Sequence, residues 1–248
     1  MKSREDPPLL IGKGQFVDDI KIEGMLYCAI VRSPYAKAII KKITRPTDPR
    51  LADFLDGKEL AKIARPYSKF EMGDRKFDHY SLPLERVHFV GEPVAAVLAK
   101  TRYDAEDLAE LVDVEYEVED AVTGIEDALD SKQKAVDSWP DNIAFKKAIT
   151  YGNFDSALRN SAHHFELETR IARQAAIPIE TRGNVTSCNP AHTGLVICTP
   201  TKGPHTTRTN AAQVFSMQEQ SIRVKVPDIG GGFGVKAYYY PESYIAPR

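Results

Sequence analysis

The amino-acid sequence predicts an α+β fold. In the N-terminal half, short apolar runs of strand length alternate with turn residues. Two strand-like runs then flank an amphipathic helical pattern over residues 93–118. An acidic, irregular stretch over residues 119–150 separates this half from a second one that again mixes helices and strands. We therefore expect a first domain over residues 1–120, a connecting segment over 121–150 and a second domain over 151–248.

The first strands are predicted on either side of a proline turn. Residues 25–31 and 38–43 carry apolar runs, and Ser33-Pro34-Tyr35 lies between them. Residues 93–98 form a continuous apolar run, which is typical of a buried strand. The first domain is therefore expected to be built mainly on strands.

A helix is predicted directly after the buried strand. Thr101 can cap its first turn, with Asp104 three residues later in a variant of the capping box. Apolar residues then follow the spacing of one helix face: Ala105, Leu108, Ala109 and Val112. Residues 114–118 return to the alternation of a strand, so a strand–helix–strand unit is expected.

The connecting segment and the second domain carry their own signals. We expect Trp139 to anchor the connecting segment on one of the domains rather than to stack on a ligand. Asn153 is expected to cap a short helix that runs to Ser161, and Pro204 to open a later helix. Strands are predicted over residues 165–172, 183–188, 195–199 and 222–226.

Composition argues against several classes of function. With 42% hydrophobic residues and a net charge of −2, the chain is typical of globular proteins and lacks the basic footprint of a nucleic-acid-binding protein. No apolar run approaches the roughly 18 residues of a membrane span, and no signal peptide is apparent, so we expect a cytoplasmic protein. Cys28, Cys188 and Cys198 show neither disulfide nor zinc spacing and are expected to be buried thiols.

The most informative feature is a glycine-rich run near residue 230. Glycines at positions 230, 231, 232 and 234 follow a predicted strand, and bare backbone of this kind can approach a ligand closely. A phosphate or cofactor loop and an ordinary tight turn both fit this composition. Val235 stands where a P-loop needs glycine before its lysine, and where a dinucleotide fingerprint needs its third glycine. Neither of these nucleotide loops is present.

With its flanks, the run VPDIGGGFGVK at 226–236 resembles the cofactor loop of the large, molybdenum-binding subunit of the xanthine dehydrogenase family. This family includes aldehyde oxidases and aerobic carbon monoxide dehydrogenases. Other stretches agree in the family's order over nearly the whole chain. They are REDP at 4–7, LLIGKG at 9–14, FVDDI at 16–20, RSPYA at 32–36, GEPVAAV at 91–97, YDAED at 103–107, ETRG at 180–183 and TKGPH at 201–205. The opening motif is most similar to the carbon monoxide dehydrogenase-like branch.

The resemblance implies an α/β-hammerhead domain followed by the truncated start of a molybdenum-cofactor-binding domain. It implies a molybdenum-pterin dinucleotide lined by Gly231, Gly232, Phe233 and Gly234. It also implies an FAD-binding medium subunit and an iron–sulfur small subunit as partners. The pterin holds the metal in this family, so no protein metal ligand is expected, and the adjacent His163-His164 pair would point to opposite faces of a strand.

The resemblance also indicates what this chain lacks. The family's general-base glutamate lies beyond Arg248, so no catalytic residue is assigned here and the chain alone is expected to be inactive. The substrate stays open among carbon monoxide, aldehydes and heterocycles. Two other hypotheses remain: a non-catalytic assembly or binding module from a split or truncated gene, whose partner would be the remainder of the large subunit, and a gene relic without function.

Three further polar positions have alternative interpretations. Lys202 stands where the family usually has a glutamine near the molybdenum oxo group, and lysine cannot accept a hydrogen bond and adds a positive charge. We favour a surface lysine or a contact with the pterin phosphate over a catalytic role. For His205, a structural hydrogen bond is favoured over contact with an anion. Glu180 and Arg182 are expected to form a structural ion pair between strands.

Overall fold

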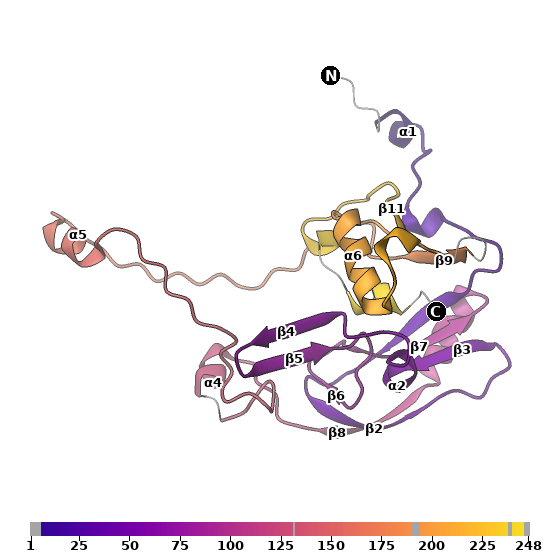
Figure 1. Ribbon diagram of the computed structural model, residues 1–248, viewed down its shortest axis with the longest axis horizontal. Helices are drawn as coiled ribbons and strands as arrows, with labels where there is room; N and C mark the ends of the chain where they lie inside the picture. Colours follow the sequence, from indigo (N-terminus) through magenta and orange to yellow (C-terminus); the bar gives the residue numbers. More distant parts are fainter. Residues whose placement is uncertain (1–5, 131, 190–193, 238–239, 246–248) are drawn as a thin grey trace.

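The computed structural model describes residues 6–130, 132–189, 194–237 and 240–245. Two three-stranded antiparallel sheets form the first unit (Figure 1). One sheet has the order β1 (Tyr27–Arg32), β7 (Pro93–Ala99) and β3 (Leu51–Asp56). The other has the order β6 (Arg86–Val87), β2 (Ala38–Thr44) and β8 (Asp113–Val118). The four strands expected in this part of the chain are thereby confirmed, within two residues at their ends.

Helix α3 (Arg102–Glu110) covers the sheet that contains β7. The predicted cap is present, because Thr101 Oγ1 accepts a hydrogen bond from the Asp104 N–H at 3.1 Å. The apolar stripe of the helix turns inward, and Ala105 and Leu108 are buried against Val97 of β7. Local capping chemistry and the helical period were therefore sufficient to place this element.

A hairpin of β4 (Ser68–Met72) and β5 (Arg75–His79) extends from the first unit, and the short helix α2 (Gly57–Leu60) follows β3. A buried carboxylate joins the hairpin to β7. The side chain of Glu92 is 1% exposed, and its Oε1 lies 3.0 Å from His79 Nε2. Its Oε2 accepts a hydrogen bond from the His88 N–H at 2.5 Å. His79 in turn lies 2.9 Å from the Tyr67 hydroxyl through Nδ1.

The second unit contains a sheet with the order β11 (Ile222–Lys225), β10 (Gly194–Cys198) and β9 (Val185–Asn189). Strands β10 and β11 are parallel, while β9 is antiparallel to β10. Helix α6 (Pro204–Phe215) makes the crossover between the parallel strands, with Pro204 in its first turn as predicted. The strands expected near 183–188, 195–199 and 222–226 correspond to β9, β10 and β11, and β9 begins two residues later than expected.

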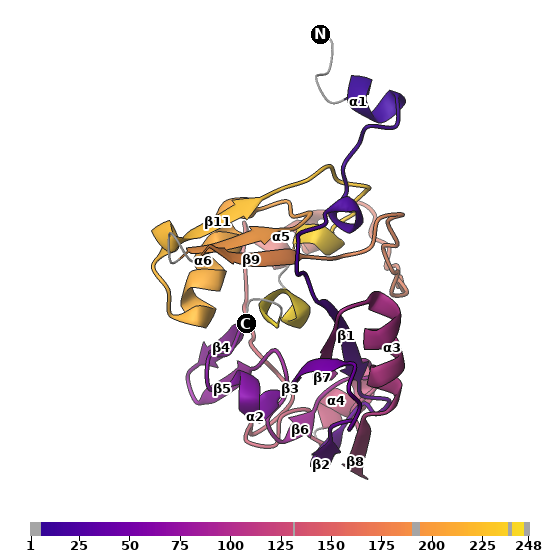
Figure 2. The same cartoon turned by 90° about the vertical axis from the view of Figure 1, so that its right-hand side faces the viewer.

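The two units share one hydrophobic core. Leu55, Leu82 and Ala96 of the first unit belong to the same buried cluster as Leu195 and Val214 of the second. The C-terminal end of the chain completes this cluster, because a 3-10 turn over Pro241–Tyr244 places Tyr244 and Ile245 inside it at 1% and 2% exposure. Figure 2 shows the second unit stacked on the first with this C-terminal turn between them. The relative placement of the two units is therefore fixed by apolar packing.

The connecting segment returns along the first unit. It contains α4 (Ile125–Asp130), and Trp139 anchors it as predicted. The Trp139 side chain is buried, its Nε1 donates to the Lys76 carbonyl oxygen at 3.0 Å, and its ring centroid lies 5.2 Å from that of Phe70. The segment is therefore attached to the β4–β5 hairpin.

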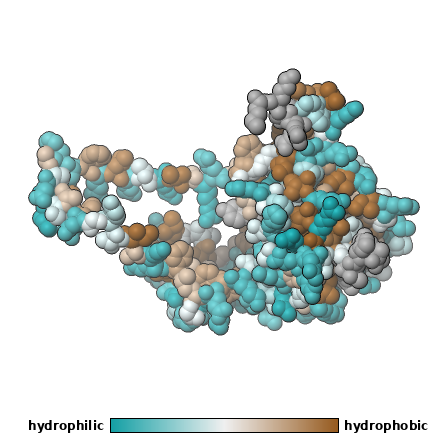
Figure 3. Space-filling model, turned by 45° about the horizontal axis from the view of Figure 1, so that its top comes forward, coloured by the Kyte–Doolittle hydropathy of each residue, from teal (hydrophilic) through white to brown (hydrophobic). Residues whose placement is uncertain are grey.

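Residues 144–179, which we call the arm, extend away from both units as a long excursion (Figures 1 and 3). Helix α5 (Phe154–Asn160) lies at its far end, and Asn153 caps this helix as predicted through a 2.9 Å hydrogen bond from the Ser156 N–H. The predicted strand over 165–172 is wrong, because those residues form no strand in the structure. A strand needs a neighbouring edge for its backbone groups, and no sheet of the described chain lies beside this segment.

At the other end of the chain, α1 (Asp6–Leu10) and a 3-10 turn over Val17–Asp19 precede β1. Val17 is buried, and the backbone of Gln15 exchanges hydrogen bonds with Asp228 of the second unit.

None of the helices in the described ranges combines the length and apolarity that a membrane crossing requires.

Candidate functional site

The glycine-rich run forms a loop between β11 and a 3-10 turn over Val235–Ala237. Three of its residues have left-handed backbone conformations: Gly231 with φ +95°, Phe233 with φ +46° and Gly234 with φ +100°. Glycine adopts such angles without strain, whereas phenylalanine does so at a cost of about 1–3 kcal/mol. The loop therefore holds Phe233 in an unfavourable conformation, and its side chain is 78% exposed.

Close packing explains glycine at two positions of the loop. A Cβ atom on Gly230 would lie 2.5 Å from the Cβ of Glu180, closer than two such atoms can approach. At Gly231 an added Cβ would lie 3.2 Å from the Pro178 side chain, in addition to the positive φ. The loop is therefore pressed against residues 178–180.

Four consecutive amides of the loop are left without an acceptor. The N–H groups of Gly231, Gly232, Phe233 and Gly234 have no hydrogen-bond partner within the described ranges. By contrast, the Gly230 N–H is bonded to Glu180, and the Val235 N–H to the Gly232 carbonyl oxygen at 3.0 Å. Unpaired amides on a backbone that turns through positive φ are suited to binding an anion.

Glu180 is the polar centre beneath this loop. Its Oε2 accepts hydrogen bonds from the Gly230 N–H at 2.8 Å and from Lys236 Nζ at 2.6 Å. Its Oε1 accepts one from the Val17 N–H at 3.3 Å. Burial raises the pKa of the Glu180 carboxyl, but Lys236 and the two amides outweigh that effect and hold the pKa below its ordinary value.

The expected ion pair between Glu180 and Arg182 is therefore wrong. Glu180 is paired with Lys236, and Arg182 turns away from it toward the C-terminal turn. The Arg182 guanidinium carbon lies 3.6 Å from the centroid of the Tyr240 ring, and its Nη2 lies 3.7 Å from the Glu242 carboxylate. The pattern along the chain could not reveal Lys236 as the partner, because it lies 56 residues away in the sequence.

The structure brings Lys202 beside the loop. Its backbone N–H donates to the Lys236 carbonyl oxygen at 3.0 Å, while its side chain is exposed. His205 lies in the first turn of α6 and is also exposed, and no structural hydrogen bond of its side chain is found in the described part of the chain. The structural role favoured for His205 therefore has no support in these contacts.

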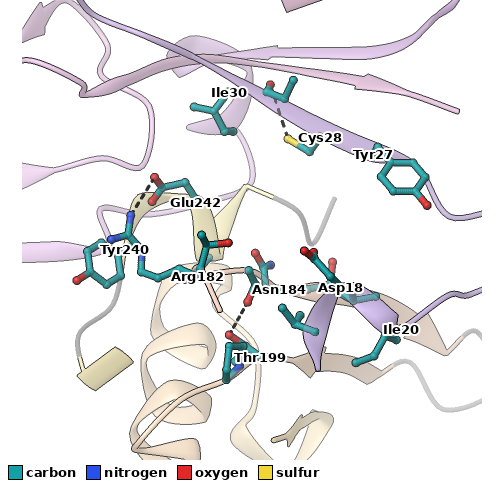
Figure 4. A pocket seen from close by; sticks show the side chains of 18 of the residues that line it. Asp18, Ile20, Tyr27, Cys28, Ile30, Arg182, Asn184, Thr199, Tyr240 and Glu242 are labelled. Atoms are coloured by element: carbon teal, nitrogen blue, oxygen red, sulfur yellow. Dashed lines mark hydrogen bonds and ion pairs between the residues drawn. The ribbon is translucent and has the colours of Figure 1, made fainter. Parts of the chain in front are cut away.

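A cavity of about 680 Å³ lies between the two units, beside the loop. Figure 4 shows Tyr27, Cys28 and Ile30 of β1 on one side, facing Arg182 and Glu242 on the other. Arg32 also pairs with Glu242, so the cavity wall carries an ion-paired cluster. Val235 and Lys236 border the cavity, whereas the loop glycines are not among its lining residues.

The cysteines do not behave as expected. Cys28 and Cys188 are exposed and Cys198 is partly buried, so the expectation of buried thiols is wrong for the first two. Among the residues that the structure describes, no group of three or more histidine, cysteine, aspartate or glutamate side chains is placed to hold a metal ion.

Comparisons with known proteins identify both units. Residues 11–120 match the family model of the aldehyde oxidase and xanthine dehydrogenase a/b hammerhead domain, and residues 136–247 match that of the molybdopterin cofactor-binding domain. The chain therefore belongs to the aldehyde oxidase and xanthine dehydrogenase family, as its motifs predicted. The predicted α+β class, with a hammerhead domain followed by part of a cofactor-binding domain, is confirmed.

Individual relatives are subunits of larger enzymes. The nicotine 6-hydroxylase large subunit of Paenarthrobacter nicotinovorans is 31% identical over 98% of this chain, which covers 30% of that protein. The carbon monoxide dehydrogenase large chain of Hydrogenophaga pseudoflava is also 31% identical, over 96% of this chain and 32% of that one. The crystal structure of quinoline 2-oxidoreductase from Pseudomonas putida 86 superposes with a TM-score of 0.91 at 34% identity, covering 98% of this chain and 32% of that chain. The present chain thus spans about a third of the length of these relatives.

Proposed function

We propose that this chain is the N-terminal portion of the large subunit of a molybdenum hydroxylase, of the carbon monoxide dehydrogenase-like or aldehyde-oxidising kind. The observation that carries the proposal is the loop at 230–234, in the part of the chain that matches the molybdopterin cofactor-binding domain. Its unpaired amides at 231–234 are suited to binding an anion. Within this proposal the chain consists of a hammerhead domain over 1–120, a connecting segment over 121–150 and an incomplete cofactor-binding domain over 151–248.

The residues of the loop fit a molybdenum-pterin dinucleotide. Gly231, Gly232, Phe233 and Gly234 present free N–H groups to its anionic parts, and the lack of a side chain at Gly232 leaves room for close approach. Lys202 lies beside the loop and supplies positive charge for a phosphate. When bound, the cofactor supplies the redox chemistry that activates a water-derived oxygen for transfer to carbon. The protein residues named here bind and orient it.

Under the same proposal, this chain is expected to be inactive when it is alone. Its curated relatives are about three times as long, and no general base is assigned to these residues. Its partners are the remainder of the large subunit, an FAD-binding medium subunit and an iron–sulfur small subunit, in a cytoplasmic complex.

The arm supports a second candidate, a non-catalytic assembly module. Its large apolar side chains stand in solvent, and several are almost fully exposed: Tyr151 at 99%, Phe165 at 90%, Ile171 at 89% and Ile179 at 102%. Exposed apolar surface of this extent is typical of a binding face. The arm lies within the match to the cofactor-binding domain, and apart from Pro178, which packs against Gly231, it extends away from both units, so a partner chain is expected to cover it.

The deciding experiment begins with the DNA that follows the codon for Arg248. If a frame there encodes the remainder, the two chains are co-expressed and purified together, and molybdenum content and oxidation of aldehydes, heterocycles and carbon monoxide are measured. The proposal expects activity from the assembled chains and none from the 248-residue chain alone. An assembled complex that never contains molybdenum would leave the assembly module as the better description. Enzyme-like oxidation by this chain by itself would contradict the proposal.

A further inference from the structure

The buried pair of Glu180 and Lys236 has no counterpart in the function derived so far. The Lys236 side chain is 3% exposed and that of Glu180 is 10% exposed, and their charged groups lie 2.6 Å apart. Charged side chains are seldom buried to this extent unless they are paired. The pair lies directly beneath the loop whose amides are free, because Lys236 follows that loop and Glu180 is bonded to its first residue.

We propose that Glu180 is the positioning residue of the loop, and that Lys236 is its counter-ion rather than a ligand for an anion. The first part concerns the fold of this chain alone. The second part rests on the proposed function, because it states which groups receive the anionic cofactor.

The carboxylate joins three separate segments of the chain. Through Oε1 it accepts the Val17 N–H from the segment before β1, and through Oε2 it accepts the Gly230 N–H and the Lys236 ammonium from the two ends of the loop. The backbone adds a further bond, because the Glu180 N–H donates to the Gly230 carbonyl oxygen at 3.1 Å. Gly230 is thus bonded to the same residue through both its N–H and its C=O, which fixes the orientation of the peptide groups that follow.

The contact between the start of the loop and residues 178–180 leaves little room for the loop to shift. A Cβ on Gly230 would lie 2.5 Å from the Glu180 Cβ, and Pro178 meets the position of Gly231 in the same way at 3.2 Å. Residues 178–180 therefore act as a fixed surface for the start of the loop. Elsewhere in the loop the described chain adds only local bonds, from the Val235 N–H to the Gly232 carbonyl oxygen at 3.0 Å and from the Ala237 N–H to the Gly234 carbonyl oxygen at 3.1 Å.

The charge of Lys236 is already neutralised. Its ammonium donates to the Glu180 carboxylate at 2.6 Å, and breaking this contact would leave a buried charge without compensation. A lysine after a glycine-rich loop suggests a phosphate ligand by analogy with the P-loop, but this ammonium is directed to Glu180 instead. Attraction for an anion must then come from the free amides and from the exposed Lys202.

The test compares the chain with Glu180→Gln, Lys236→Met and the double variant. Glu219→Gln is the control, because its partner Arg208 forms a similar pair at 3.2 Å on the surface, with side chains 39% and 46% exposed. Amide exchange of Gly230 and Val235, the two hydrogen-bonded N–H groups on either side of the free amides, is measured by NMR after circular dichroism has shown that each variant is folded. We expect each single variant to speed this exchange at least about tenfold, because each leaves the other charge unpaired. The double variant should return to within about threefold of wild type, since both charges are gone.

The positioning role of Glu180 would be overturned if exchange in both single variants equalled that in the control. A double variant as fast as the single ones would refute the explanation that an unpaired charge causes the loss of protection. Acidification gives a readout specific to the carboxylate. After correction for intrinsic rates, protection of the Gly230 amide should be lost in wild type as pH falls through the lowered pKa of Glu180, and the Glu180→Gln variant should show no such step.

Inorganic pyrophosphate tests the second part. It is titrated into wild type and the double variant while the amide shifts of 231–234 are followed. Affinities within about threefold support Lys236 as a counter-ion only, and a loss of about tenfold or more in the double variant would make it a ligand and refute this part. If wild type itself shows no binding, the anion-binding loop of the proposed function fails, whereas the exchange data still decide the role of Glu180.

Discussion

Glu92 allows a sharp prediction, because the structure gives it a role that its motif did not disclose. It lies in the GEPV stretch at 91–94, and its carboxylate is 1% exposed. The carboxylate contacts two histidines: His79 through Nε2 at 3.0 Å, and His88 through its N–H at 2.5 Å and its Nδ1 at 3.5 Å. Both partners are themselves partly buried, so removing the carboxylate leaves polar groups that water cannot fully reach.

Glu92→Ala should therefore destabilise the protein by about 3–5 kcal/mol, the cost of breaking a buried charged contact from one side. Glu92→Gln keeps the shape of the side chain and one carbonyl oxygen. It should therefore lower the free energy of unfolding by about 1–3 kcal/mol, the cost of leaving one buried polar group with a poorer hydrogen-bond partner. For a protein of this size these values correspond to melting temperatures lower by roughly 2–4 °C per kcal/mol. The matched control is Glu106→Gln on α3, whose pair with Arg102 is exposed and should change stability by less than about 1 kcal/mol.

The pH dependence supplies an independent check. Burial raises the pKa of Glu92, but the contacts with His79 and His88 outweigh it and the pKa is lowered. A carboxyl with a lowered pKa contributes stability that is complete above its unfolded pKa of about 4.3 and is lost as pH falls through the folded value. Urea unfolding measured from pH 7 down to about pH 3 should show a shallower loss for Glu92→Gln than for wild type. Equal slopes, or Glu92→Ala as stable as the Glu106→Gln control, would refute this account.

Three further predictions concern the loop, the connecting segment and the shared core. Gly230→Ala should lower the free energy of unfolding in urea by about 1–3 kcal/mol, because its Cβ would meet Glu180. Gly232→Ala should change that free energy by less than about 1 kcal/mol, because its Cβ would meet only Lys236 at 3.9 Å. Trp139→Ala should detach the connecting segment and speed limited proteolysis between residues 121 and 142, and a cleavage rate equal to that of wild type would contradict the anchor. Tyr244→Ala should lower the melting temperature of both units in one calorimetric transition, because Tyr244 lies in the core they share; two separate transitions in wild type would refute a common core.

The sequence was a good guide wherever structure is decided by neighbouring residues. The cap of α3 at Thr101, the start of α6 at Pro204 and the cap of α5 at Asn153 all depend on side chains within one helical turn, and all are present. The family and the fold class were also predictable, because the motifs occur in order along the chain. The substrate and the cofactor-contacting residues stay predictions.

The wrong strand and the wrong ion pair share one physical cause, since each depends on a distant partner. The alternating segment at 165–172 has strand composition, but a strand exists only when another edge satisfies its backbone groups. Glu180 and Arg182 lie close in sequence, yet each is paired with a residue from the C-terminal end of the chain. Neither Lys236 nor Glu242 could be matched to its partner from spacing alone, because ion pairing across a fold leaves no local pattern.

The glycines of the loop are required for different reasons, which the sequence alone does not distinguish. Gly230 is required by its close approach to Glu180, and Gly231 and Gly234 by their positive φ. Gly232 has neither a positive φ nor a close neighbour, so nothing within the described chain requires glycine there. Its bare backbone is therefore best explained by an approach from outside the chain, at the centre of four unpaired amides. Under the proposed function we therefore predict Gly232 as the point of closest contact with the cofactor, and substitution of Gly232 would separate ligand approach from folding.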